Sequence, residues 1–100
     1  MSAREEVRKL LLESINNYAS EQNLNLPLDN NTPLLGRGAV LDSLGLVNIL
    51  VDFEAALNDR FNTELVLASE KAMAMERSPF RSVGRLVEYA DSLLKEVGKA

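Results

Sequence analysis

The chain has no cysteine and no histidine among its 100 residues, and these two absences exclude much catalytic chemistry. Without cysteine there is no disulfide framework, no thiolate nucleophile and no cysteine-based zinc site. Without histidine there is no Ser-His-acid triad, and the residue that most often transfers protons near neutral pH is missing. We therefore expect that the protein is not an enzyme.

Tryptophan is also absent, and aromatic residues make up only 5% of the chain, whereas hydrophobic residues make up 46%. A core built from Leu, Val and Ala favours packed helices over a sheet. The net charge is −4, from 15 acidic and 11 basic residues. An acidic chain does not suit a nucleic-acid partner, whose phosphates need a basic surface.

Long hydrophobic runs are missing as well. The first residues lead directly into amphipathic sequence, and no uninterrupted apolar stretch reaches the length of a signal peptide or a membrane span. The length suits one small domain over residues 1–100. We expect a cytoplasmic monomer with no membrane insertion.

Three segments have helical periodicity: 3–19, 43–58 and 82–97. In the first, Val7, Leu11 and Ile15 recur at helical spacing, and Tyr18 extends the stripe. Ser82 is a candidate N-cap for the last segment, and Gly98 is a candidate stop. That segment carries the widest apolar stripe: Val83, Leu86, Val87, Ala90, Leu93, Leu94 and Val97.

The remaining sequence forms two connections. Residues 20–41 contain Asn, Pro and Gly that break any sustained helix, but their interspersed leucines predict a loop held against the core. Residues 68–75 favour a short helix after a turn at Asn62-Thr63, and Pro79 ends that segment. The predicted fold is all-α, a small four-helix bundle of three main helices and a shorter third helix, with a long first loop.

The segment 43–58 has two apolar sides when it is drawn as a helix. Leu44, Val47, Val51 and Ala55 lie roughly opposite the side expected to face the core. Burial on both sides would explain this second stripe, but in so small a chain we favour a recognition surface. The predicted core side consists of Leu46, Ile49, Leu50, Phe53 and Leu57.

Ser43 begins this segment, where a serine can cap a helix or present its hydroxyl for modification. Its surroundings resemble those of acyl carrier proteins. The resemblance extends over roughly residues 3–94 and rests on LLG at 34–36, VLDSLGLV at 40–47, DFE at 52–54, RFNTEL at 60–65 and SVGRLVEY at 82–89. Asp-Ser-Leu alone is a weak signal, and its position before an amphipathic helix makes it specific.

The resemblance implies that Ser43 receives 4′-phosphopantetheine from coenzyme A, attached by a separate, Mg²⁺-dependent phosphopantetheinyl transferase. The arm would carry acyl groups as thioesters to acyl-transferring, condensing or other lipid-biosynthesis enzymes. Asp42 would position Ser43 and contact the transferase. It also implies a docking surface on the same helix. Its apolar residues would be Leu44, Val47 and Val51, and its acidic residues, which steer basic partners, would be Asp52, Glu54 and Asp59.

The chain departs from the family in two respects, one of which is that the segment 65–75 is more apolar and longer than usual before the last helix. Gly45, Asn48, Ala55 and Ala56 stand in a stretch where carriers of fatty-acid synthesis usually have several acids. Both differences favour a specialised carrier over a general fatty-acid carrier, with a modified lipid, polyketide-like or cell-envelope product. The alternative is a non-covalent helical interaction module in which Ser43 is only a helix cap.

Another group of charges stands near the last segment. Arg77, Arg81 and Arg85 form a local basic cluster around Pro79. We interpret this cluster as a solvated surface, with a weak docking contact as the alternative.

Overall fold

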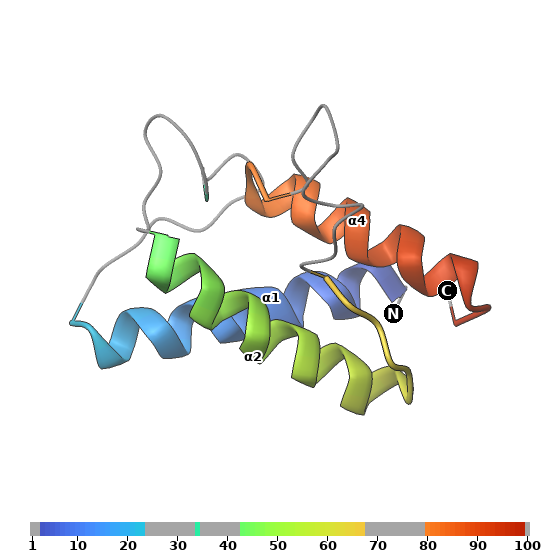
Figure 1. Cartoon of the computed structure of the whole chain (residues 1–100), viewed down its shortest axis with the longest axis horizontal. Coiled ribbons are helices and arrows are strands. Elements are labelled where there is room, and N and C mark those ends of the chain that lie inside the picture. The colour runs from blue at the N-terminus through green and yellow to red at the C-terminus, as the bar shows by residue number, and fades with distance from the viewer. Residues whose placement is uncertain (1–2, 24–33, 35–42, 68–79, 100) are drawn as a thin grey trace.

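The computed structural model describes residues 3–23, 34, 43–67 and 80–99. All regular structure in these ranges is helical, as predicted, and it comprises α1 (Ala3–Glu21), α2 (Ser43–Phe61) and α4 (Val83–Glu96) (Figure 1). The predicted short helix at 68–75 lies outside the described residues. The described fold is therefore an arrangement of three helices, and the four-helix bundle is not confirmed.

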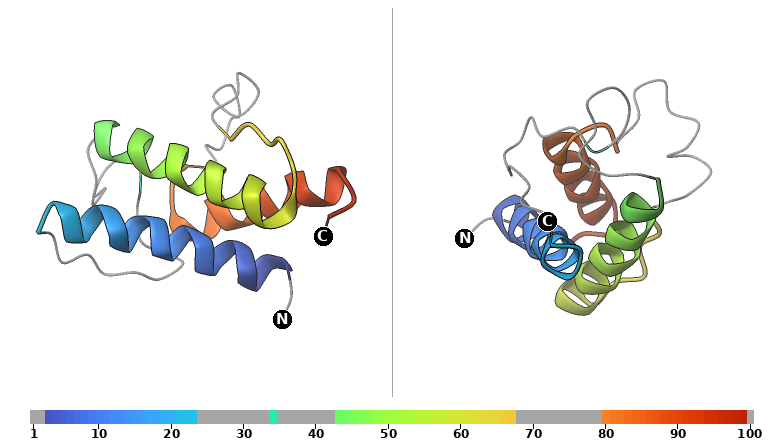
Figure 2. Two further views of the ribbon diagram at one scale, coloured as in Figure 1. Left: turned by 90° about the horizontal axis from the view of Figure 1, so that it is seen from below. Right: turned by 90° about the vertical axis from the view of Figure 1, so that its left-hand side faces the viewer.

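The first helix packs against both of the others. α1 and α2 lie side by side and run in opposite directions, and α4 also packs across α1 (Figures 1 and 2). An ion pair joins the start of α1 to the end of α2, with Arg60 Nε 3.4 Å from Glu6 Oε2. Viewed along the helices, the three form the corners of a triangle around a common core (Figure 2, right).

The core follows the predicted apolar stripes. Val7, Leu11 and Ile15 of α1 are completely buried, as are Phe53 and Leu57 of α2. The predicted core side of α2 is confirmed at all five positions. In α4 the stripe is confirmed from Val83 to Leu94, except that Leu93 is only half-buried and Val97 is 52% exposed; the buried members are Val83, Leu86, Val87, Ala90 and Leu94.

Val97 is exposed because α4 ends before it. The helix stops at Glu96, and Gly98 takes a left-handed conformation with φ of +76°, so the chain turns out of the helix where the sequence predicted a stop. At the other end, the predicted N-cap is confirmed: Ser82 Oγ accepts a hydrogen bond from Arg85 N at 3.3 Å. α4 is therefore delimited by local sequence at both ends.

The first connection is described at one residue only. Leu34 is buried, at 1% exposure, and its N–H donates to Arg81 O at 2.9 Å. This contact confirms that the first connection is held against the core at Leu34. The other leucines in 24–33 and 35–42 lie outside the described residues.

Candidate functional site

The candidate site is at the start of α2. Ser43 is the first residue of this helix, so the change from connection to helix occurs where the sequence predicted it. The first turn contains no acidic side chain. The N-terminal turn of a helix leaves backbone N–H groups without helical acceptors and carries the positive end of the helix dipole. A negatively charged group attached here would therefore meet no carboxylate from the first turn of α2. Asp42 lies outside the described residues.

The second apolar stripe of α2 is exposed. Leu44, Val47 and Val51 are 70%, 53% and 64% exposed, and Ala55 continues the stripe one turn further on. The choice between a helix buried on both sides and a helix with a free apolar face is settled in favour of the free face. We call Leu44, Val47 and Val51 the α2 strip. Contiguous exposed apolar side chains of this kind are typical of protein-interaction surfaces.

The predicted acidic residues differ in their surroundings. Asp52 and Asp59 are exposed, as a role in steering a partner requires. Glu54 is half-buried, and its Oε2 accepts a hydrogen bond from Leu67 N at 3.2 Å. Glu54 therefore holds the segment after α2 against the helix, a structural role that the sequence prediction did not include.

Gly45 offers a physical reason for one departure from the carrier pattern. This residue is buried in the first turn of α2, between exposed Leu44 and buried Leu46. A carboxylate at this position would start from a buried backbone and would lose part of its hydration. Asn48, by contrast, is exposed, so burial does not explain the missing acid at position 48.

A small polar hollow lies beside the α2 strip. It has a volume of about 190 Å³ and lies between the second half of α1 and the first half of α2. Asn48 and Asp52 line it from α2, opposite the buried Ser14 and the half-buried Tyr18 of α1. The exposed face of α2 thus borders a polar recess.

The end of α2 is organised by Asn58, which the sequence reasoning missed. Its Oδ1 accepts from Leu65 N at 2.7 Å and from Thr63 Oγ1 at 2.9 Å, and its Nδ2 donates to Leu65 O at 3.1 Å. The turn between them contains Asn62 with φ of 54°, which confirms the predicted helix exit. The only signal in the sequence was an asparagine one turn before Asn62-Thr63.

Two negative findings limit the chemistry of the described residues. No group of three or more acidic residues there is arranged to hold a metal ion. None of the described helices combines the length and apolar character needed to cross a bilayer.

Comparisons with protein-family models, curated proteins and solved structures found no match to the chain. Its function must therefore be inferred from the residues themselves.

Proposed function

We propose that the protein is an acyl carrier in which Ser43 is the attachment site of 4′-phosphopantetheine. The observation that carries this proposal is the α2 strip. Three large apolar side chains are exposed on the helix that Ser43 begins, and the first of them follows Ser43 directly. A modified serine beside a docking surface is what a carrier needs, because each partner enzyme must bind the protein and reach its arm.

The residues present suit the proposed group. The arm would be joined to Ser43 through a phosphodiester, and an anion at the start of α2 is favoured by the helix dipole and opposed by no first-turn acid. When bound, the arm supplies the thiol that holds acyl groups as thioesters. The chain has no cysteine of its own, so a carried thiol is the only thiol available to it.

The chain would take part in this modification as a substrate. It has no histidine to activate the serine hydroxyl, so the general base and the Mg²⁺ would belong to the phosphopantetheinyl transferase. The α2 strip would bind the transferase and, afterwards, the acyl-transferring, condensing or other lipid-biosynthesis enzymes. Asp52 and Asp59, both exposed, would attract basic surfaces on these partners. We propose that the carrier acts in the cytoplasm.

Intact-mass spectrometry tests the proposal. The purified protein is incubated with coenzyme A, Mg²⁺ and a promiscuous phosphopantetheinyl transferase. We expect the mass of one phosphopantetheine group to be added, and none to be added to Ser43→Ala. Ser20→Ala is the matched control, since Ser20 is an exposed serine at the end of α1, and this variant should be modified like the parent protein.

The second candidate is a non-covalent interaction module that binds a partner helix on the α2 strip. The same exposed side chains favour it, and Ser43 would then serve only to begin the helix. An unchanged mass with several competent transferases would reject the carrier and leave the interaction module. If the carrier is correct, mass analysis of the acyl group on natively purified protein would separate a general fatty-acid role from a specialised lipid or polyketide-like role.

A further inference from the structure

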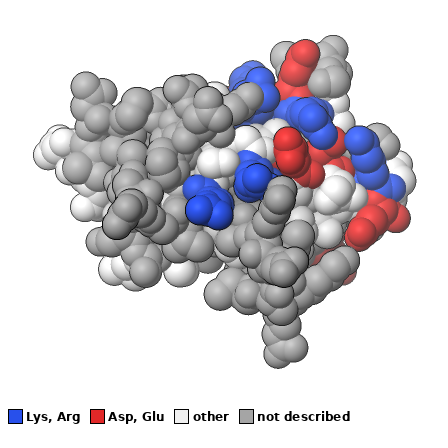
Figure 3. Space-filling view, turned by 90° about the horizontal axis from the view of Figure 1, so that it is seen from above, with Lys and Arg blue, Asp and Glu red and all other residues white. Residues whose placement is uncertain are grey.

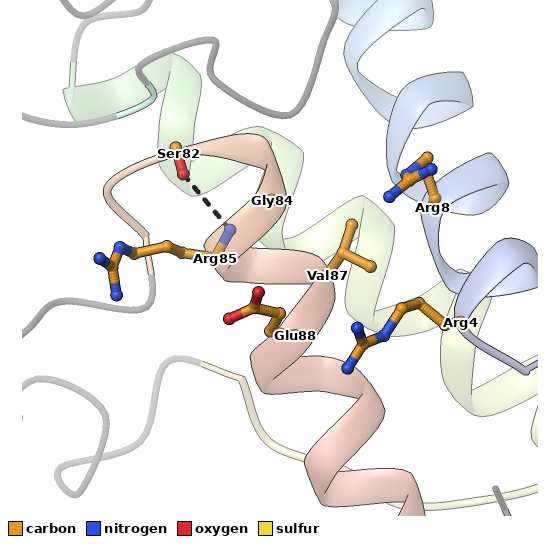
Figure 4. A pocket seen from close by; sticks show the side chains of 7 residues that line it. All are labelled: Arg4, Arg8, Ser82, Gly84, Arg85, Val87 and Glu88. Carbon is orange, nitrogen blue, oxygen red and sulfur yellow. Dashed lines mark hydrogen bonds between the residues drawn. The ribbon is translucent and has the colours of Figure 1, made fainter.

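A second hollow lies between α1 and α4. It has a volume of about 340 Å³, and its charged lining comprises Arg4 and Arg8 of α1 and Arg85 and Glu88 of α4. We call it the α1–α4 hollow. This hollow is lined by residues of α1 and α4, whereas the recess beside the α2 strip is lined by residues of α1 and α2. Arg4 and Arg8 give the α1 side of the hollow a positive charge in a protein whose net charge is −4, whereas the Arg85 guanidinium extends from α4 away from α1 (Figure 4).

Arg8, one of the residues that line this hollow, has an unmet hydrogen-bonding requirement. Its Nε is buried and has no hydrogen-bond partner. A buried N–H without an acceptor loses its hydration without compensation, so such groups are rare and need an explanation. An anion in the hollow would pair with the guanidinium of Arg8, whose N–H groups lie in one plane that matches the oxygens of a phosphate or carboxylate, and a rotation of this side chain toward the anion would give the Nε–H its acceptor.

Arg4 can contribute to the same anion. Its guanidinium and that of Arg8 both extend from α1 toward α4 (Figure 4). Arg4 pairs with Asp91 at 3.3 Å, but Lys95 also pairs with this carboxylate, at 3.2 Å. Since Lys95 compensates Asp91 and a guanidinium has five N–H donors, Arg4 keeps donors for a ligand.

The start of α4 adds to the positive potential. Ser82 and Gly84 line the hollow, and the Arg85 N–H is occupied by the Ser82 side chain. The backbone N–H groups before Arg85 belong to the helix start, where the dipole favours an anion. Glu88 has the opposite effect. Its carboxylate lies near the hollow on α4 and would repel a highly charged ligand (Figure 4).

We propose that the α1–α4 hollow binds a phosphate group, with Arg8 and Arg4 as its main ligands. The volume exceeds the needs of a single phosphate ion and falls at the lower end of small-molecule sites, roughly 300–1,000 Å³. The ligand class is therefore a phosphate group free in solution or at the end of a small phosphorylated molecule. Basic and acidic side chains lie close together on the face over α4 (Figure 3), which disfavours an extended polyanion such as nucleic acid.

Nuclear magnetic resonance titration tests this site in the full chain. Inorganic phosphate and glycerol 3-phosphate are added separately at constant ionic strength, with sodium chloride as the reference. We expect saturable shifts at the Gly84 and Arg85 amides and at the Arg8 side-chain Nε–H. Tighter binding of glycerol 3-phosphate indicates a phosphorylated small molecule, and equal binding indicates that the phosphate group alone is recognised.

Variants separate a built site from general charge attraction. Arg8→Gln should weaken binding by about tenfold or more, as expected for a lost charge-assisted pair. Arg81→Gln is the matched control, since Arg81 is exposed and does not line the hollow; it should leave binding within about twofold, as expected when only screened charge is lost. Glu88→Gln should tighten binding. If Arg8→Gln fails to fold, Arg8→Lys keeps the charge without the planar donors and should still bind more weakly.

Chemical shifts that change linearly with phosphate concentration would overturn the proposed site. Equal losses of phosphate affinity in Arg8→Gln and Arg81→Gln would also overturn it. The inference is independent of the proposed carrier function. Ser43→Ala should bind phosphate like the parent protein, so failure of one proposal leaves the other intact.

Discussion

Arg4 and Asp91 form an ion pair across 87 positions of sequence, with Arg4 Nη2 3.3 Å from Asp91 Oδ2. The Asp91 side chain is only 5% exposed, whereas Arg4 and Lys95, its two cationic partners, are 50% and 61% exposed. Asp91 is thus a buried carboxylate whose charge is compensated by two cations at the surface. Its place is structural, because it fastens the start of α1 to the middle of α4.

Loss of this carboxylate should destabilise the fold. We expect Asp91→Ala to lower the free energy of unfolding by about 1–3 kcal/mol, because both ion pairs of the buried carboxylate are lost. The loss stays moderate because Arg4 and Lys95 are half-exposed and can be hydrated instead. Urea denaturation followed by circular dichroism measures the change. Glu13→Ala, at an exposed position of α1, should change stability by less than about 0.5 kcal/mol. Equal stability of the two variants would contradict the role given to Asp91.

Asn58 should control the segment that follows α2. Asn58→Ala removes all three side-chain hydrogen bonds to Thr63 and Leu65, and we expect a loss of about 1–3 kcal/mol together with faster hydrogen exchange at the Leu65 amide. Asn58→Asp keeps an acceptor for the Leu65 N–H but loses the donor to Leu65 O. Its stability should therefore lie between that of the parent protein and that of Asn58→Ala. Unchanged exchange at Leu65 in Asn58→Ala would show that the segment is held by other contacts.

The Arg8 side chain should lower the stability of the protein when no anion is bound in the α1–α4 hollow. Arg8→Met removes a buried N–H that has no partner and keeps much of the side-chain volume, so we expect a gain of about 1 kcal/mol. Thermal unfolding in a buffer without phosphate measures it. Lys9→Met, on an exposed neighbouring position, should produce no comparable gain. A lower melting temperature for Arg8→Met than for Lys9→Met would mean that Arg8 stabilises the empty protein.

The α2 strip should matter for partners and not for folding. Val51→Asp places a charge where the side chain is 64% exposed, so the helical circular-dichroism signal and melting temperature should change little. If the strip docks the transferase, the rate of phosphopantetheine transfer should fall by about tenfold or more, as for other charges introduced into apolar interfaces. Ile49→Asp, on the buried side, should unfold the domain. A normal rate of phosphopantetheine transfer in Val51→Asp would show that Val51 is not part of the docking surface.

The faces of the helices were predictable because hydrophobic periodicity depends only on neighbouring residues. Leu46, Ile49 and Phe53 face the core and Leu44, Val47 and Val51 face outward, as the pattern predicted. Local signals also gave the cap at Ser82 and the stop at Gly98.

Pairings between distant residues could not be predicted in the same way. Nothing around Asp91 indicates that Arg4 will reach it, and the periodicity of α2 does not show that Glu54 will accept the Leu67 N–H. The buried Arg8 Nε depends on how α1 meets α4, a tertiary relationship that no local pattern contains. At the candidate site, the sequence predicted the exposed apolar strip but not the polar recess beside it.

The hydrogen bond from Leu34 to Arg81 limits how far the start of α2 can lie from the start of α4. Leu34 is the one described residue between positions 24 and 42, and eight residues, 35–42, separate it from Ser43 along the chain. Leu34 is hydrogen-bonded to Arg81, just before α4. Because fewer than ten residues of chain join Leu34 to Ser43, the start of α2 can lie at most ~30 Å from Leu34. Any movement of Ser43 toward a partner is therefore limited to this distance from the buried backbone of Leu34.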